Sequence, residues 1–357
     1  YKPRRSTRRK PTMGTYDQIF STLGLESWCE SDEKSGDGPV SMADLLAQNA
    51  GADIPAQSIW ELPFPSMDEL HESCAAFPQS RALTKSIEEG FLSIKDGLSF
   101  VLDPLTQPLS WFLEGSLWLF ETTPWWIMIP ALLVLVMFVS RSGKLVAFVG
   151  ASLLLLAFID YYTFSVQTLA IIFVCAFLCV MIGVPIGIAM SRSNRLQRIV
   201  IPILDMLQTL PPFVYLIPLI FLFSVTEPKL YGIAIILYAI VPVIRLTDLG
   251  IRLVDTDVIE AANAYGMTDR QKLFKVEIPL ALPNIMAGVN QTIMMSLAMV
   301  VIASLVSAPG LGVLVLRGIR NLELGVGLVS GLGIVLLAVM LDRTTKLALA
   351  RINTPQD

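Results

Sequence analysis

The chain has 357 residues, of which 54% are hydrophobic and 16% charged, and a formal net charge of −4. Soluble globular domains carry about a quarter charged residues, so this composition excludes a soluble enzyme and predicts an integral membrane protein. The chain has one histidine, His71, and no G-x-x-x-x-G-K-[ST] loop, which excludes a histidine-based metal site, a Ser-His-Asp triad and an ATP-binding loop.

Residues 1–83 are predicted to be a polar, acidic extracytoplasmic extension that is partly disordered. Residues 11–124 contain 18 acidic and 4 basic side chains, and residues 30–58 are rich in Asp, Ser, Gly and Ala. Residues 1–10 contain six Lys and Arg, and a start at Met13 would make residues 1–12 an upstream segment. Cys29 and Cys74 would form a disulfide in an oxidising compartment; the alternative is two separate thiols, because nothing in the sequence fixes their distance.

Residues 84–123 are predicted to form amphipathic interfacial helices. Apolar side chains recur there at helical spacing: Ile87, Phe91, Ile94, Leu98 and Leu102. After Pro104 and Pro108, a second helix is expected around residues 111–120, with both helices lying on the outer membrane surface. The alternative is a small helical packing element that touches no lipid.

Residues 124–345 are predicted to be the transmembrane domain. A membrane span needs about 20 apolar residues, and seven segments approach this length, of which the first, second and fifth are short. They are residues 125–139, 145–159, 166–190, 199–223, 230–244, 282–307 and 325–341. Gly183-x3-Gly187 and Gly327-x3-Gly331 predict close helix packing.

Basic residues in alternate short loops predict the orientation of the chain in the membrane. They follow the first, third, fifth and seventh segments, at residues 141–144, 192–198, 245–275 and 343–351. These loops and the 346–357 tail are therefore expected on the cytoplasmic side of a bacterial inner membrane, with the N-terminus extracytoplasmic. Arg317 and Arg320 argue weakly against this orientation.

The loop over residues 255–283 is predicted to form a helix, a tight turn and a second helix. Asp257 is the expected N-cap of the first helix and Gly266 its terminating glycine. The second helix is expected from Thr268 or Asp269 to Val276, with Pro279 ending the unit. This element suits docking into another protein. An ordinary amphipathic loop is the alternative, and a DNA-reading helix-turn-helix is disfavoured because the loop lies between membrane spans and lacks a basic face.

The residues of this loop resemble the EAA signature of ATP-binding-cassette (ABC) importer permeases, E-A-A-x3-G-x9-I-x-L-P. In that family the loop forms coupling helices that seat in a cleft of a separate ATPase. The resemblance implies that the ATPase-coupling positions are Glu260, Ala261, Ala262, Gly266, Val276, Ile278 and Pro279. Val276 and Ile278 depart mildly from the usual Ile and Leu.

The wider sequence resembles the glycine betaine and proline betaine permeases of osmoprotectant uptake systems. The similarity covers residues 84–345 and is carried by residues 207–218, 243–251, 288–292 and 316–319. It implies an all-α, type I importer permease fold and a non-enzymatic transport subunit without a cofactor of its own. Implied partners are a second copy of the chain, two ATPase subunits holding ATP and Mg²⁺, an extracytoplasmic solute-binding protein and membrane lipid, with no nucleic acid. Trimethylamine N-oxide, choline and carnitine are alternative solutes.

Polar residues and prolines inside two segments are expected near the translocation pathway, because polar groups at membrane depth face a wet cavity or a protein partner. They are Gln208, Thr209, Pro212, Phe213, Tyr215, Asn290, Gln291 and Thr292. The alternative is hydrogen bonding between helices without solute contact. A rival function is an ion-coupled osmolyte transporter that works without an ATPase and uses Asp205 as its coupling carboxylate.

Overall fold

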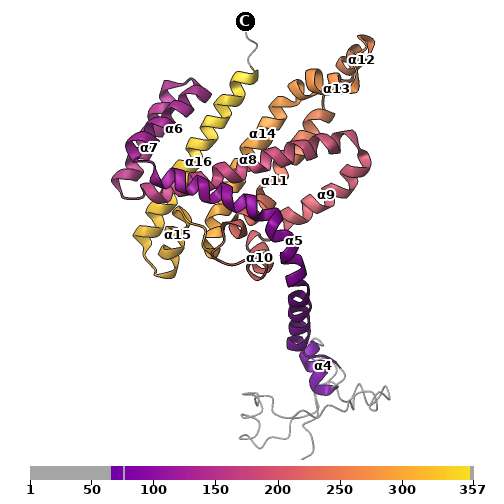
Figure 1. The fold of residues 1–357 in the computed structure, drawn as a ribbon, viewed down its shortest axis with the longest axis vertical. Coiled ribbons are helices and arrows are strands. Elements are labelled where there is room, and N and C mark those ends of the chain that lie inside the picture. Colours follow the sequence, from indigo (N-terminus) through magenta and orange to yellow (C-terminus); the bar gives the residue numbers. More distant parts are fainter. Residues whose placement is uncertain (1–65, 75–76, 354–357) are drawn as a thin grey trace, which may run out of the picture. The chain divides into compact units, whose positions relative to one another are not determined.

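The computed structural model describes residues 66–74 and 77–353. The described residues form helices and turns, with no strand among them (Figure 1), so the all-α prediction is confirmed. The chain divides into two units, residues 1–94 and 95–357. The predicted domain boundary at residue 83 stays a prediction. Residues 1–65 lie outside the described residues, so their predicted acidic and partly disordered character also stays a prediction.

In the first unit, α4 (Met67–Ser73) precedes the beginning of α5 (Ser80–Thr122). The Asp68 carboxylate accepts hydrogen bonds from the backbone N–H of Ser80 at 2.8 Å and from its hydroxyl at 2.6 Å. These bonds from Ser80 lower the pKa of Asp68, because they favour the ionised carboxylate. Asp68 therefore fixes the start of α5.

The structure corrects the prediction of two helices separated by Pro104 and Pro108. Both prolines lie inside the single helix α5. Tertiary packing explains why the helix continues: Leu113 is fully buried, and Leu109 and Leu113 lie against Gly232. This apolar contact outweighs the hydrogen bonds that the two prolines remove.

Each predicted membrane segment corresponds to a helix, but the helices differ in length. They are α6 (Trp125–Ser140), α7 (Gly143–Phe158), α8 (Tyr162–Arg192), α9 (Asn194–Thr209), α10 (Leu216–Leu222), α11 (Pro228–Arg252), α14 (Ile278–Ala303) and α16 (Leu324–Asn353). The shorter α15 (Leu311–Arg320) lies between α14 and α16 in the chain.

Four helices in the described part of the chain are long and apolar enough to cross a membrane, or up to six if each bent pair counts as one span. This is fewer than the predicted seven. Helices α6 and α7 have 16 residues each, or about 24 Å at the rise of an α-helix, against a hydrocarbon core of about 30 Å. The fourth predicted segment is bent by 104° between α9 and α10, where Pro211 and Pro212 interrupt it.

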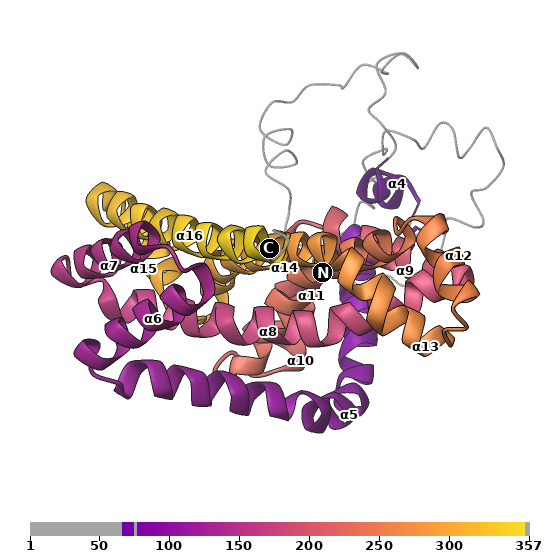
Figure 2. The same ribbon diagram turned by 90° about the horizontal axis from the view of Figure 1, so that it is seen from above.

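Helix α11 forms the centre of the second unit, between α8 and α14 (Figures 1 and 2). The predicted close packing at Gly183 and Gly187 is confirmed. A Cβ at Gly183 would lie 2.5 Å from Val243 Cγ1, and one at Gly187 would lie 2.6 Å from Thr247 Cβ. In the second pair, Gly327 packs against a glycine of α15, whereas a Cβ at Gly331 would meet nothing within 4 Å.

Candidate functional site

The first helix of the predicted docking loop is α12 (Thr256–Ala264). Its N-cap is Asp255, which accepts a hydrogen bond from the N–H of Asp257 at 2.9 Å, so the predicted cap at Asp257 is wrong by two residues. Gly266 has φ +72°, and the N–H of Met267 donates to the carbonyl of Ala262 at 3.2 Å. These features form the glycine-terminated turn that the sequence predicts.

The second helix begins as predicted at Asp269, as α13 (Asp269–Lys272). Its N-cap is Thr268, which forms a reciprocal capping box with Gln271. The Lys272 ammonium group closes the turn, since it lies 3.1 Å both from the Asn263 side-chain oxygen and from an Asp269 carboxylate oxygen. Contacts on both sides of Gly266 therefore hold α12 and α13 together.

The structure corrects the prediction that Pro279 ends this unit. A π-helical turn (Leu273–Glu277) joins α13 to α14, and the N–H of Ile278 donates to the carbonyl of Leu273. Pro279 falls in the first turn of α14, where a missing N–H removes no necessary bond. The helix therefore continues from the loop into the membrane body.

An ion pair fastens the π turn to α8. Arg192 Nη2 lies 2.6 Å from Glu277 Oε2, and the Glu277 side chain is only 6% exposed. Sequence reasoning missed this pair because the partners are 85 residues apart. The sequence indicates the pair only through Glu277 itself, a carboxylate in the otherwise apolar stretch of residues 276–283.

A second polar network joins the end of α11 to the turn between α8 and α9. Arg252 donates to the Asn194 side chain at 2.8 Å and to the Met190 carbonyl at 2.7 Å, and pairs with Asp248 at 2.9 Å. Gln197 donates to the same aspartate at 2.7 Å. The ends of α8, α9 and α11 are thus tied together next to the docking loop.

The EAA residues divide between the protein interior and its surface. Ala262 is 4% exposed and faces the chain itself, whereas Glu260, Ala261 and Gly266 are exposed. Of the remaining coupling positions, Pro279 is exposed and Val276 and Ile278 are partly buried. The loop also exposes two large side chains, with Tyr265 at 86% and Phe274 at 66%. An apolar surface of this kind is typical of a docking site for another protein.

The predicted pathway residues of the α9–α10 region lie around the bend. Gln208 and Thr209 are exposed at the end of α9, and the Gln208 amide lies 3.9 Å from the Met295 sulfur of α14. Pro212 begins the 3-10 turn Pro212–Tyr215, in which Phe213 is exposed and Tyr215 is buried. The structure therefore places the bend beside the middle of α14.

The three predicted residues of α14 point in different directions. Gln291 is exposed, one helical turn before Met295 and hence on the side of Gln208. Asn290 instead bonds to Thr345 and, at 3.1 Å, to Asp342 of α16, which is the hydrogen bonding between helices that the sequence left open. Thr292 is fully buried, and its hydroxyl has no hydrogen-bond partner among the described residues.

Comparison with known proteins identifies the family. Residues 179–353 match the protein family described as the binding-protein-dependent transport system inner membrane component. The chain is 39% identical over 246 residues to the glycine betaine/carnitine transport permease protein GbuB of Listeria monocytogenes, covering 68% of this chain and 86% of GbuB. The chain belongs to this family of permeases.

Two other relatives match this permease over only part of their own length. The chain is 47% identical over 196 residues to the glycine betaine/proline betaine permease protein ProW of Escherichia coli, which is 55% of each protein. It is 35% identical over 260 residues to the trimethylamine N-oxide permease protein TmoV of Ruegeria pomeroyi, covering 71% of this chain and 38% of TmoV. The chain thus spans about half the length of ProW. The predicted family resemblance is confirmed, and with it a multi-pass membrane protein.

Two charged contacts in this permease were not predicted. Asp205 of α9, the carboxylate of the rival hypothesis, forms an ion pair with Arg245 of α11. Lys229, whose side chain is 5% exposed, pairs with Asp103 at 2.8 Å and with Glu227 at 2.9 Å. In the predicted disulfide, Cys74 is buried but Cys29 lies outside the described residues, so the pair stays a prediction.

Proposed function

We propose that this permease is the membrane-spanning subunit of an ATP-driven importer of methylated-amine osmolytes. The observation that carries the proposal is the exposed α12–α13 loop: its Glu260, Ala261 and Gly266 are exposed, while the Arg192–Glu277 pair ties the loop to α8. The relatives support it, because their names give glycine betaine, proline betaine, carnitine and trimethylamine N-oxide as the transported solutes.

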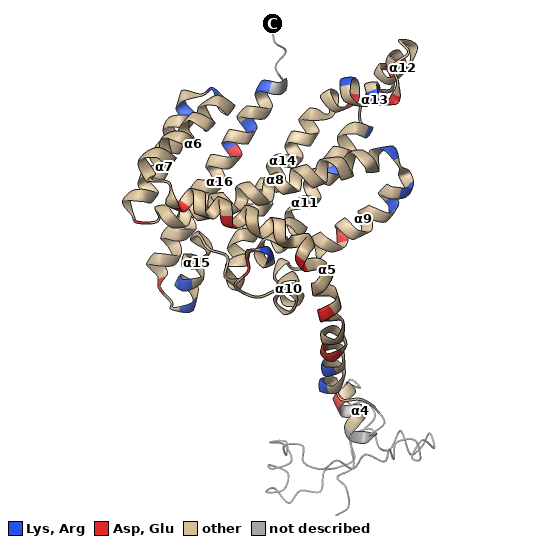
Figure 3. Ribbon diagram, in the orientation of Figure 1, with Lys and Arg blue, Asp and Glu red and all other residues tan. Residues whose placement is uncertain are grey.

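In the proposed mechanism the chain itself hydrolyses nothing. It acts as a homodimer with two ATPase subunits, which hold ATP and Mg²⁺ and receive α12 and the exposed Tyr265 in a cleft. An extracytoplasmic binding protein delivers the solute at the opposite side of the membrane. The loops and the C-terminus face the cytoplasm and the N-terminus faces outward, in agreement with the basic charge at the loop side (Figure 3).

Closure of the ATPase pair would move α12 and the π turn together. The Glu277 carboxylate then pulls on Arg192 at the end of α8, and the Arg252 network carries the displacement to the start of α9. The other end of α9 carries Gln208, beside Met295. A movement at the loop therefore reaches the 104° bend between α9 and α10, where we place the gate.

The proposed solute pathway runs along the α9–α10 bend and the exposed face of α14. Gln208, Thr209 and Gln291 offer polar groups to the passing solute, and Phe213 offers an exposed aromatic ring. Aromatic faces attract quaternary ammonium groups. Asn290 and Thr292 contribute by holding α14 against its neighbours, since neither is exposed at this face.

Reconstitution in liposomes tests this function. The chain, its ATPase and its binding protein should together take up labelled glycine betaine when ATP is supplied on the loop side, and omission of any one protein should abolish uptake. Competition with carnitine and trimethylamine N-oxide then ranks the solutes. Uptake by the chain alone, driven by a sodium or proton gradient, would instead establish the ion-coupled transporter. The Asp205–Arg245 pair argues against that alternative, because the carboxylate already has a cationic partner.

A further inference from the structure

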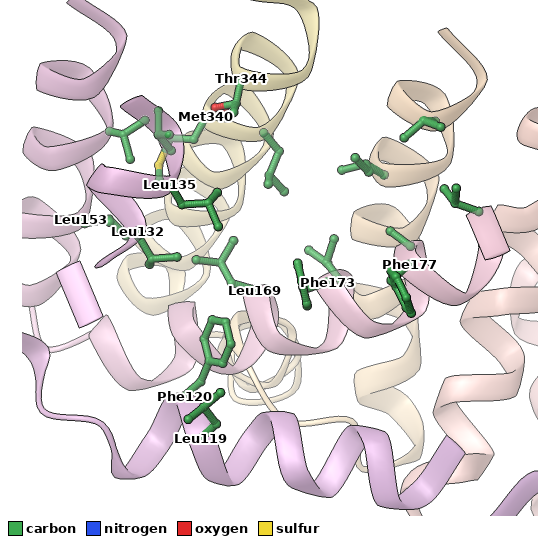
Figure 4. A pocket seen from close by; sticks show the side chains of 18 residues that line it. Leu119, Phe120, Leu132, Leu135, Leu153, Leu169, Phe173, Phe177, Met340 and Thr344 are labelled. Atoms are coloured by element: carbon green, nitrogen blue, oxygen red, sulfur yellow. The ribbon is translucent and has the colours of Figure 1, made fainter. Parts of the chain in front are cut away.

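The second unit contains an apolar groove that the proposed transport function does not use. Its volume is about 560 Å³, and five helices of the membrane body and the end of α5 form its walls (Figure 4). Phe120 lies at one end and Thr344 at the other, with Phe173 and Phe177 of α8 along one wall.

The lining of this groove excludes a polar solute. Thr344 carries the only polar side chain of the lining, and its hydroxyl donates to the Met340 carbonyl at 2.7 Å. Three phenylalanines could face a methylated ammonium group, but a carboxylate beside it would find no donor. Because a buried charge without a partner is strongly disfavoured, the groove does not bind a zwitterionic osmolyte. Its chemistry fits a hydrocarbon chain.

The Thr344 end of the groove lies at the end of the unit where the α6–α7 turn and α16 carry basic residues. Arg351 lies on the same face of α16 as Thr344, two turns further along, and its guanidinium donates to the carbonyls of Phe138 and Val139 at 3.0 and 2.7 Å. This contact joins the end of α16 to the end of α6. The basic rim at this end consists of Arg141, Lys144, Arg343 and Arg351. Lys346 lies about half a turn around α16 from Thr344 and pairs with Asp342 at 2.8 Å.

Figure 3 shows Lys and Arg at the α6–α7 turn and near the end of α16, at one end of the unit. Lys and Arg on α15 lie at the opposite end of this side of the body, away from Thr344. An apolar channel that ends in several cations complements one class of molecule, an amphiphile with a negatively charged head.

We propose that the groove binds an anionic phospholipid, with one acyl chain between α6, α8 and α16 and the phosphate at the basic rim. The acyl chain fills space that the protein leaves open among Leu135, Phe173 and Phe177, whose side chains are 52%, 62% and 53% exposed. Each Lys or Arg near a charged lipid surface strengthens binding by about fivefold. The bound lipid fills the space between the helix pair α6–α7 and α8 and so stabilises their packing.

The test measures phospholipid on the full chain, extracted from its membrane in mild detergent. Mass spectrometry identifies the retained lipid, and back-titration with phosphatidylglycerol or phosphatidylcholine gives the apparent affinity for each. The wild type is expected to retain phosphatidylglycerol-type lipid. The double variant Arg141→Gln, Arg343→Gln should bind it about 25-fold more weakly, from about fivefold for each cation. The variant Ala176→Leu should also weaken binding, because its side chain enters the groove.

The matched control is Arg317→Gln with Arg320→Gln, which removes the same charge from α15, a helix that does not line this groove. Equal loss of affinity in the control would overturn the proposal, as would equal affinity of the wild type for phosphatidylcholine. Retained affinity in Ala176→Leu, with an unchanged helical circular dichroism spectrum, would also overturn it. A Leu135→Cys chain that forms a disulfide with a second copy would show that another chain occupies the groove. Circular dichroism of every variant identifies those that fail to fold.

Discussion

Replacing Gly266 by alanine tests the docking loop with a single methyl group. A Cβ at this position would meet nothing within 4 Å, so the substitution creates no steric clash. The entire effect comes from the backbone, because φ is +72° and this left-handed conformation costs an L-residue about 1 to 2 kcal/mol. The smaller entropy of the unfolded alanine chain offsets about 0.4 to 1 kcal/mol of that cost. The net destabilisation of the turn is about 1 kcal/mol, or a factor of about five in its population.

Hydrogen exchange of the loop and transport in liposomes together check this reasoning. Peptides covering residues 256–272 should exchange about fivefold faster in Gly266→Ala than in the wild type, in line with the turn's lower population. The melting temperature of the whole chain should change little, because the turn lies at the surface. ATP-driven uptake should fall in parallel with the loss of the turn. Gly266→Asn is the matched control, since asparagine tolerates the left-handed conformation. If the two variants behave alike, the backbone conformation of Gly266 is not what shapes the loop.

Three further perturbations probe other contacts. Gly187→Ala should destabilise the chain by about 1 to 3 kcal/mol through overpacking between α8 and α11. Gly331→Ala, which meets open space inside α16, should instead raise the melting temperature slightly, because alanine lowers the entropy of the unfolded chain; equal destabilisation by the two variants would refute close packing at the first site. Arg192→Ala should lower the free energy of unfolding by about 1 to 2 kcal/mol, because it leaves the buried Glu277 carboxylate without its cation. The loss is moderate because Arg192 is partly exposed and its charge is screened by solvent. Adding Glu277→Gln to this variant should recover most of the loss, and a double-mutant cycle measures the coupling. Hydrogen bonding lowers the pKa of Asp68 below its ordinary value of 3.8. The ionised carboxylate should therefore protect the start of α5 from hydrogen exchange above pH 3.8, and this protection should be lost as the pH falls through the lowered pKa. Asp68→Asn should abolish this pH dependence.

Local chemistry made the docking loop predictable from the sequence. The glycine at 266 and the cap at Thr268 act through neighbouring backbone groups, so their turn follows from a few residues. The end of the unit was not predictable in the same way. A proline after a charged helix indicates a stop, yet the π turn places Pro279 where its missing N–H does no harm.

Contacts between distant segments account for the remaining differences. The continuity of α5 through two prolines depends on Leu113 packing near Gly232, which no local pattern reveals. Asn290 has the composition of a pathway residue, but α16 supplies its partners. The number of membrane spans was overestimated because apolar composition identifies a helix in an apolar environment but not its length. Helices α6 and α7 are apolar but shorter than the about 20 residues that a span needs.

The helix that starts at Asp269 runs on to Val306 as a rod of 38 residues, about 57 Å at 1.5 Å per residue. The π turn and Pro279 both lie inside this continuous helical segment, so a force applied at the loop passes along helical backbone into the membrane body. The docking loop and the middle of α14 therefore belong to one helical segment. Rotation of this segment by even a few degrees would move Gln291 sideways relative to the α9–α10 bend. Helix α14 would then transmit movement of the docking loop to the proposed solute pathway.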